Sequence, residues 1–255
     1  MSETLLWEKQ NDGIAYVIIN KPERRNAMDA DLMVKMVQVL EQLDQDTDVR
    51  VIILKGQGDH FSSGGDLKAG VGGEPTVENS RAALQKFIFA VRKIQEMEKP
   101  VIAMVKGYAV GGGMSLAMVC DIVFASEDAK FSSNFLKVGI TPEMGAMLLM
   151  PMMMGAQRAK ELWFTGRVID AAEAKELGFV NRVYTAEEIE NATRNFAADL
   201  AQMPALPVRI TKRITNSTLF SLLNSVMEAE LQSTPFCTQT EEHKSLIEAF
   251  KNRKK

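Results

Sequence analysis

In the first half of the chain, short runs of apolar, mostly β-branched residues alternate with longer segments whose apolar residues recur at helical spacing. The runs at 14–20, 51–55 and 101–106 predict buried strands, and the segments at 31–43 and 80–97 predict helices. Regular alternation of strands and helices is typical of α/β proteins. We therefore expect an α/β fold.

The second half continues this pattern and then becomes helical. It predicts a helix at 114–119, a second helix that opens at Pro142 and a third at 171–177. It also predicts strands at 122–125 and 179–183. From Ala186 onward nearly the whole pattern is helical, with Pro204 and Pro207 as breaks, and the helical C-terminal region begins at about residue 195. We expect a core over residues 1–195 and a helical region over residues 196–255, whose apolar faces pack on the core or on another subunit.

Two glycine-rich turns each follow an apolar, strand-like run. The first is Phe61–Leu67 and the second is Gly107–Met114. Glycine allows two backbones to approach one ligand atom and leaves their N–H groups free to donate to it. If the amides of Gly65 and Gly112 point at one position, they form an oxyanion hole, which stabilises an enolate or tetrahedral intermediate. The turns therefore predict an enzyme that acts next to a carbonyl group.

Composition narrows the classes of partner. The chain is 46% hydrophobic and 25% charged, as in ordinary globular proteins, and no apolar run approaches the roughly 20 residues of a membrane helix. Its 30 basic and 33 acidic residues give a net charge of −3, without the concentrated basic surface that nucleic-acid binding requires. We expect neither membrane spanning nor nucleic-acid binding.

The cysteines and the first residues bear on the compartment. Cys120 and Cys237 lie far apart without metal-ligand spacing, so we expect neither a disulfide framework nor a bound metal. Residues 1–6 lack the basic start and long apolar centre of a secretory signal, which favours a cytoplasmic protein.

Two further features have both a structural and a functional interpretation. The methionine-rich run Met147–Met154 either fills irregular gaps in the core, which we favour, or lines an adaptable acyl pocket. His60 precedes the first glycine turn, either as a plain loop residue or with a direct role.

Additional motifs follow one another in a defined order over nearly the whole chain. They are Asn20-Lys21-Pro22 with Asn26-Ala27-Met28, Phe61–Leu67, Gly107–Ala117 with Cys120-Asp121-Ile122, Thr165-Gly166-Arg167, Ala174, Gly178, Val180, and Glu248-Ala249-Phe250. One glycine triplet alone is a weak signal, whereas the ordered set is specific. The set resembles the crotonase, or enoyl-CoA hydratase/isomerase, superfamily.

The resemblance implies a spiral of ββα units, assembled as a homotrimer or a dimer of trimers. It also implies an acyl-coenzyme A thioester as substrate, so coenzyme A enters with the substrate and no separate cofactor is expected. By position, the oxyanion donors are the amides of Gly65 and Gly112. The residues implied to contact the nucleotide and pantetheine portions are Arg25, Ala27, Ser63, Gly64, Asp66 and Leu67, and the C-terminal Phe250 and Lys251 resemble residues that reach a neighbouring subunit's ligand.

Members of the family that catalyse different reactions carry different acidic and basic side chains, so these positions indicate which reaction to expect. Family hydratases use two glutamates, and the matching positions here are Ser115 and Phe135, neither of which activates water near neutral pH. Ordinary hydratase activity is therefore expected to be very weak. Glu143 matches the position where some family isomerases carry a catalytic acid. The expected reaction converts a 3-enoyl-CoA to a 2-enoyl-CoA, with Glu143 carrying the proton and Phe135 excluding water, which raises the pKa of that carboxyl.

Three of these side chains also have structural interpretations. Glu143 suits the first turn of a helix, where an acid stabilises the helix dipole. Asp66 is favoured as the cap of the following helix over a ligand contact. Ser115 either donates to a polar substrate or simply belongs to the first turn of its helix.

Two other functions stay open. Family decarboxylases or isomerases of carrier-protein-bound polyketide intermediates have similar patterns at residues 134–137 and 141–145, although they tend to lack an acid where this chain has Glu143. The absence of both hydratase acids also fits a catalytically inactive acyl-CoA-binding homologue.

Overall fold

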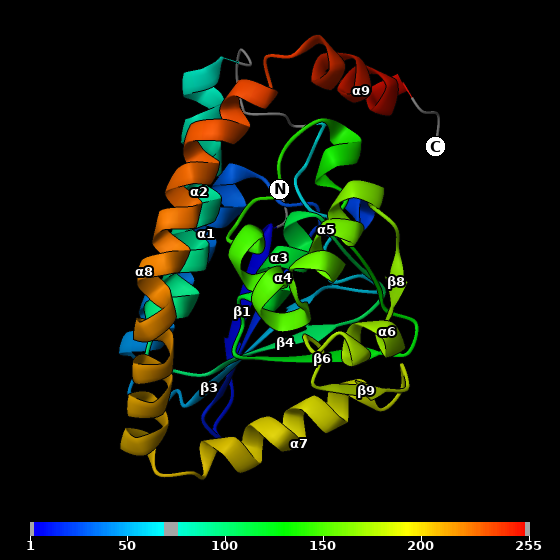
Figure 1. Cartoon of the computed structure of the whole chain (residues 1–255). Coiled ribbons are helices and arrows are strands. Elements are labelled where there is room, and N and C mark those ends of the chain that lie inside the picture. Colours follow the sequence, from blue (N-terminus) through cyan, green and yellow to red (C-terminus); the bar gives the residue numbers. More distant parts are fainter. Residues whose placement is uncertain (1–2, 69–75, 253–255) are drawn as a thin grey trace.

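The computed structural model describes residues 3–68 and 76–252 (Figure 1). The expectation for residues 1–6 therefore falls partly outside the described residues. Within them, no helix combines the length and the apolar character needed to cross a bilayer.

A six-stranded sheet forms the centre of the molecule, in the order β1-β2-β3-β4-β6-β9. Only the edge strand β1 runs antiparallel to its neighbour, whereas the other adjacent pairs are parallel. The strands are β1 (Leu5–Lys9), β2 (Ile14–Ile19), β3 (Val51–Gly56), β4 (Val101–Val105), β6 (Ile122–Ser126) and β9 (Arg182–Tyr184). The α/β class expected from the alternating pattern is confirmed.

Helices cover both faces of this sheet (Figure 1). Ala15 and Val17 of β2 face the larger core with α1 (Ala30–Gln45) and α2 (Val77–Glu96), whereas Ile14 faces α7 (Ile189–Ala201). Strands buried on both faces need apolar side chains at every position, which explains their continuous apolar runs.

A smaller three-stranded sheet carries the second glycine turn. It consists of β5 (Tyr108–Val110), β7 (Lys130–Ser132) and β8 (Ile169–Asp170), in the order β5-β7-β8. These strands have two or three residues each, which is too short for a recognisable pattern in the sequence.

The remaining helices correct two expectations. They are α3 (Gly112–Met118), α4 (Ala146–Met154), α5 (Ala156–Thr165), α6 (Ala171–Glu176), α8 (Ala205–Cys237) and α9 (Glu241–Asn252), with 3-10 turns η1 (Pro22–Arg24) and η2 (Phe135–Val138). The helix expected to open at Pro142 begins four residues later, so Glu143 is not in its first turn. Pro207 does not break α8, because it lies in the first turn, where no backbone N–H is needed.

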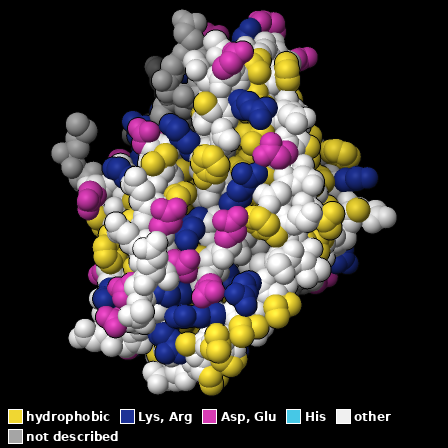
Figure 2. Space-filling view, turned by 90° about the vertical axis from the view of Figure 1, so that its left-hand side faces the viewer, with side chains coloured by type: hydrophobic (Ala, Val, Ile, Leu, Met, Phe, Trp, Pro, Cys, Tyr) yellow, Lys and Arg dark blue, Asp and Glu magenta, His cyan; other side chains and the backbone are white. Residues whose placement is uncertain are grey.

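The long helix α8 packs along α2 and also contacts α4 of its own chain (Figure 1). Its buried face includes Leu223, Met227 and Leu231. Figure 2 shows the outer face of this region, where hydrophobic side chains are scattered among basic and acidic ones. The division at residue 195 stays a prediction. In the methionine run, Met150 and Met154 are buried in the core, whereas 58% of Met152 is exposed, so core packing explains only part of the run.

A buried lysine joins α8 to the main sheet. Lys212 Nζ donates to Asp121 Oδ2 at 2.7 Å and to the Lys99 carbonyl oxygen at 2.9 Å, and the same carboxylate oxygen accepts the Val101 amide at 2.7 Å. Removing one partner of a buried pair is costly because the other is left without a counter-charge.

The variant Lys212→Met should lower the free energy of unfolding by about 2–4 kcal/mol, measured by urea denaturation. Arg213→Met is the matched control, because that side chain is 63% exposed and lies 3.8 Å from Glu98. The control should change stability by less than about 0.5 kcal/mol. Equal losses in both variants would contradict a special role for the buried pair.

Candidate active site

Three loops meet at one edge of the main sheet, after the carboxyl ends of β2, β3 and β4. The Gln57 amide donates to Ile19 at 2.8 Å, and the Phe61 amide donates to Lys106 at 2.8 Å. Loops that follow neighbouring parallel strands lie together, which is where α/β proteins commonly bind ligands. The sheet therefore brings both glycine turns and the 20–28 turn to one place.

Direct backbone contacts join the two glycine turns. Ser62 donates to Tyr108 at 2.9 Å and accepts from Val110 at 3.0 Å. A Cβ on Gly64 would lie 2.6 Å from the Val110 carbonyl oxygen. A Cβ on Gly113 would collide with the Ser62 carbonyl oxygen. Only glycine fits these two positions.

The two predicted donor amides lie close together. A Cβ on Gly112 would lie 4.0 Å from the Gly65 nitrogen, and one on Gly64 would lie 3.4 Å from the Gly112 nitrogen. Met28 binds the carbonyl of Gly64 and the amide of Asp66, which leaves the Gly65 amide between them unused. Gly112 is the first residue of α3, whose initial amides have no intrahelical acceptor. Among the described residues, neither amide has a hydrogen-bond acceptor, so both are available to one oxyanion.

The 20–28 turn lies against the first glycine turn. Arg25 and Asn26 have left-handed backbones, with φ of 51° and 56°. The Arg25 carbonyl accepts the Ser63 amide at 2.9 Å, and Met28 pairs with Gly65 in a parallel bridge. The proposed contact residues Arg25, Ala27, Ser63 and Gly64 are therefore brought together, while Leu67 follows as a half-buried residue near the end of the described segment.

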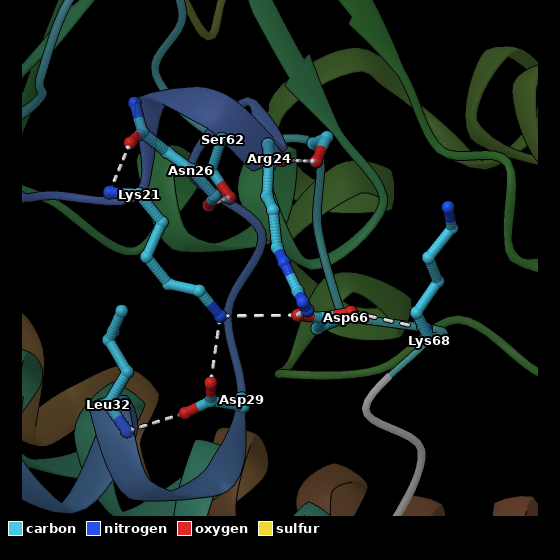
Figure 3. Close-up of polar contacts among 9 residues, drawn as sticks. Lys21, Arg24, Asn26, Asp29, Leu32, Ser62, Asp66 and Lys68 are labelled. Carbon is cyan, nitrogen blue, oxygen red and sulfur yellow. Dashed lines mark hydrogen bonds and ion pairs between the residues drawn. The ribbon is translucent and has the colours of Figure 1, made fainter. Parts of the chain in front are cut away.

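The side chain of Asp66 forms a polar network with two basic residues. It accepts from Lys21 at 3.2 Å and Arg24 at 2.8 Å, and its second oxygen accepts the Lys68 amide at 3.1 Å (Figure 3). Helix α2, which begins at Val77, is capped by Thr76. The residues directly after Lys68 lie outside the described residues, so the cap expected at Asp66 stays a prediction.

His60, Phe135 and Ser115 border the glycine turns. His60 Nδ1 accepts the Tyr108 amide at 3.3 Å, which gives this residue a structural contact. The buried Phe135 ring lies 3.9 Å from a Cβ placed on Gly111. Ser115 lies in the first turn of α3, and its hydroxyl donates to the Glu143 carbonyl oxygen at 3.1 Å. Ser115 therefore ties the Glu143 segment to the glycine helix.

Glu143 lies on the loop between η2 and α4, next to the second glycine turn. The sulfur of its neighbour Met144 lies 3.1 Å from a Cβ placed on Gly112. Part of the residue stays open to solvent, yet its carboxyl is closely surrounded by protein. Burial, together with repulsion from Glu230, raises its pKa to about 8. A carboxyl with such a pKa both accepts and returns a proton near neutral pH.

Glu230 of α8 is a residue that the sequence analysis did not identify. It is fully buried, and its carboxylate accepts the Gly145 amide at 3.1 and 3.2 Å. Burial raises its pKa to about 7, against the opposing effect of its backbone hydrogen bonds. A signal was present in the sequence, since Glu230 falls on the apolar face that includes Leu223, Met227 and Leu231.

Comparisons with known proteins agree with this architecture. Residues 9–255 match the family described as enoyl-CoA hydratase/isomerase. A crotonyl-CoA hydratase of Syntrophomonas wolfei is 32% identical over 254 residues, covering 99% of this chain and 96% of the relative. A short-chain-enoyl-CoA hydratase of Clostridium acetobutylicum is 32% identical over 244 residues, covering 95% and 92%. The chain thus belongs to the enoyl-CoA hydratase/isomerase family, within the crotonase superfamily.

Solved structures show the same fold. An enoyl-CoA hydratase/isomerase from Xanthobacter autotrophicus Py2 is 29% identical with a TM-score of 0.91, covering 98% of this chain and 94% of that one. An enoyl-CoA hydratase from Bacillus halodurans is 26% identical with a TM-score of 0.90, covering 97% and 100%. The crotonase-type fold is therefore confirmed, and the chain is an enzyme of this family.

The contact between the two glycine turns should be essential for activity. Gly113→Ala should lower kcat/KM at least about 100-fold, because its methyl group displaces Ser62 and separates the two amides. The control Gly65→Ala should keep the wild-type melting temperature, since its Cβ meets nothing within 4 Å. A Gly113→Ala enzyme with full activity would contradict the convergence of the two donors.

The buried carboxyl of Glu143 should reduce stability at high pH. Its pKa is about 8 in the folded state and about 4.5 in the unfolded state. Between pH 4.5 and pH 8 the folded state therefore keeps a proton that the unfolded state has lost. Stability should therefore fall as pH rises through this window. Glu143→Gln should be more stable than wild type by on the order of 1–3 kcal/mol at pH 9, with no difference at pH 4.

Urea denaturation across this pH range measures the difference. The exposed Glu187→Gln should differ from wild type by less than about 0.5 kcal/mol throughout. A stability gap for Glu143→Gln that does not change with pH would rule out the linkage.

Proposed function

We propose that this enzyme is an acyl-CoA isomerase that converts a 3-enoyl-CoA to a 2-enoyl-CoA. The observation that carries the proposal is a buried carboxyl of raised pKa, Glu143, on a loop next to the closely spaced amides of Gly65 and Gly112. Glu143 removes a proton from C2 of the substrate, and the same acid returns it to C4. The reaction uses neither a metal nor a cofactor other than the coenzyme A of the substrate.

The amides of Gly65 and Gly112 hold the thioester oxygen while the dienolate carries its negative charge. One such donor contributes on the order of 10²–10³ in rate, and a positioned base contributes about 10²–10⁴. Helix α3 begins at Gly112 and directs its positive end toward the same oxygen. Arg25, Ala27, Ser63, Gly64, Asp66 and Leu67 belong to the proposed binding wall.

The side chains at the positions matching the hydratase glutamates support isomerisation over hydration. Phe135 carries no ionisable group, and the Ser115 hydroxyl already donates to a backbone carbonyl. Neither residue activates water. A single acid that exchanges protons with carbon needs no bound water.

Hydration of a 2-enoyl-CoA is the second candidate, favoured by the names of the relatives, which are described as hydratases. In that reaction Glu143 would have to activate water alone. Isomerisation or decarboxylation of a carrier-protein thioester uses the same oxyanion hole, and assays with both kinds of thioester distinguish them.

We include a homotrimer or a dimer of trimers in the proposal. Several large apolar side chains are exposed in the single chain, among them Phe164 at 72% and Val168 at 56%. Such a surface is typical of an interface with another protein chain.

The test compares wild type with Glu143→Gln on a 3-enoyl-CoA. The variant should lose about 10²–10⁴ in kcat while calorimetry shows acyl-CoA binding within about threefold of wild type. In D2O, the first turnover of wild type should leave mostly protium at C4, because Glu143 returns the proton that it removed from C2. A wild-type enzyme that hydrates 2-enoyl-CoA faster than it isomerises 3-enoyl-CoA would overturn the proposal, and absence of both activities would favour a binding protein.

A further inference from the structure

We propose that Glu230 of α8 is a positioning residue for this site, which holds the backbone of residues 143–145 in place and adds a negative charge beside Glu143. The inference rests on the proposed function in that Glu143 is taken as the base. It concerns a residue from a different part of the chain, 87 positions further on, that contacts neither proposed oxyanion donor.

The contacts of Glu230 are with backbone amides. Its two carboxylate oxygens accept the Gly145 amide at 3.2 and 3.1 Å, and the nearby backbone amides of Met144 and Met147 also stabilise its charge. These amides lie at and just before the start of α4, where the first N–H groups have no intrahelical acceptor. One buried carboxylate therefore satisfies the start of the helix and the end of the loop that carries Glu143.

The backbone at this point needs such support. Met144 has φ of 62° and Gly145 has φ of 79°, so two successive residues adopt the left-handed conformation. This conformation is unfavourable for a residue with a side chain, such as Met144, and persists only where surrounding contacts hold it. The hydrogen bonds to Glu230 are the contacts that act directly on these two amides.

Holding Met144 also affects the oxyanion hole. The Met144 sulfur packs 3.1 Å from the Cβ position of Gly112, and the Ser115 hydroxyl donates to the Glu143 carbonyl. A shift of the loop would therefore move the base relative to the donor amides. A displacement of the order of 1 Å between reacting groups is enough to reduce kcat strongly.

Few titratable side chains lie on the elements around Glu143. On α9, His243 packs against Gly139, and its Nδ1 lies 2.6 Å from the Val138 carbonyl oxygen. Helices α3 and α4 carry no ionisable side chain. In η2, the aliphatic part of Lys137 lies against Gly166, and on α8 the carboxylate of Glu228 is paired with Arg92. Glu230 is the charged group whose repulsion acts on the Glu143 carboxyl. Removing this charge should make Glu143 easier to ionise, because like charges in a buried site disfavour each other.

The first experiment titrates the carboxyls directly, without an activity assay. Infrared difference spectra follow the C=O band of protonated Glu143, assigned by its loss in Glu143→Gln. In Glu230→Gln the midpoint of that band should fall by about one pH unit. Glu228→Gln on the same helix, which removes a partly exposed charge, should leave it within about 0.2 units. An unchanged midpoint in Glu230→Gln overturns the electrostatic part of the inference.

The second experiment measures positioning. On a 3-enoyl-CoA, the acid limb of the Glu230→Gln pH–rate profile should move to lower pH, and kcat at pH 9 should fall at least about tenfold with KM within about threefold. Glu230→Asp, which keeps the charge on a shorter side chain, should lose kcat without the shift in the profile. Wild-type kcat in both variants overturns the positioning role.

A measurement on wild type keeps the inference testable if Glu230→Gln does not fold. Because repulsion raises the pKa of the carboxyl that ionises second, the C=O band of Glu230, assigned by its absence in Glu230→Asp, should disappear at lower pH than that of Glu143. A Glu143 band that titrates first overturns the proposed coupling. Failure of the proposed function looks different: wild type then has no isomerase activity, while the infrared titrations still decide whether Glu230 acts on Glu143.

Discussion

The active site depends on the close approach of two backbone turns that leaves no room for a side chain. Gly64 and Gly113 face the carbonyl oxygens of Val110 and Ser62, and any Cβ at either position would displace the opposite turn. This contact places the amides of Gly65 and Gly112 close together. Because the turns follow the neighbouring strands β3 and β4, the parallel sheet supplies the rigid support that an oxyanion hole requires.

The molecule buries charged groups in two ways, one with a counter-charge and one without. Lys212 pairs with Asp121 and two backbone groups, so its charge is compensated and α8 is attached to the sheet. Glu143 and Glu230 are two acids brought into one region with no cation between them, and the pKa of each is raised. Such an arrangement lowers stability at high pH, and it is typical of sites where a proton must move. The two uncompensated acids therefore lower the stability of the fold locally at high pH.

The enoyl-CoA hydratase/isomerase family places different acids and bases around one shared oxyanion hole, so the fold alone does not decide the reaction. Relatives described as hydratases share about a third of their residues with this chain. The chemistry follows instead from the side chains at a few positions. In the proposed isomerase, Phe135 and Ser115 occupy the positions that match the hydratase glutamates, and the loop before α4 provides the acid.

Local patterns were enough to predict the α/β class, the strands β2, β3, β4 and β6, and the two glycine turns, because these depend on periodicity and on residues with special backbone freedom. The family pattern pointed to Glu143. The folded structure was needed to find where α4 begins, that Asp66 pairs with Lys21 and Arg24, and that Glu230 meets the loop of Glu143. These are contacts between segments tens of residues apart, and no local pattern encodes which buried polar groups will meet when the chain folds.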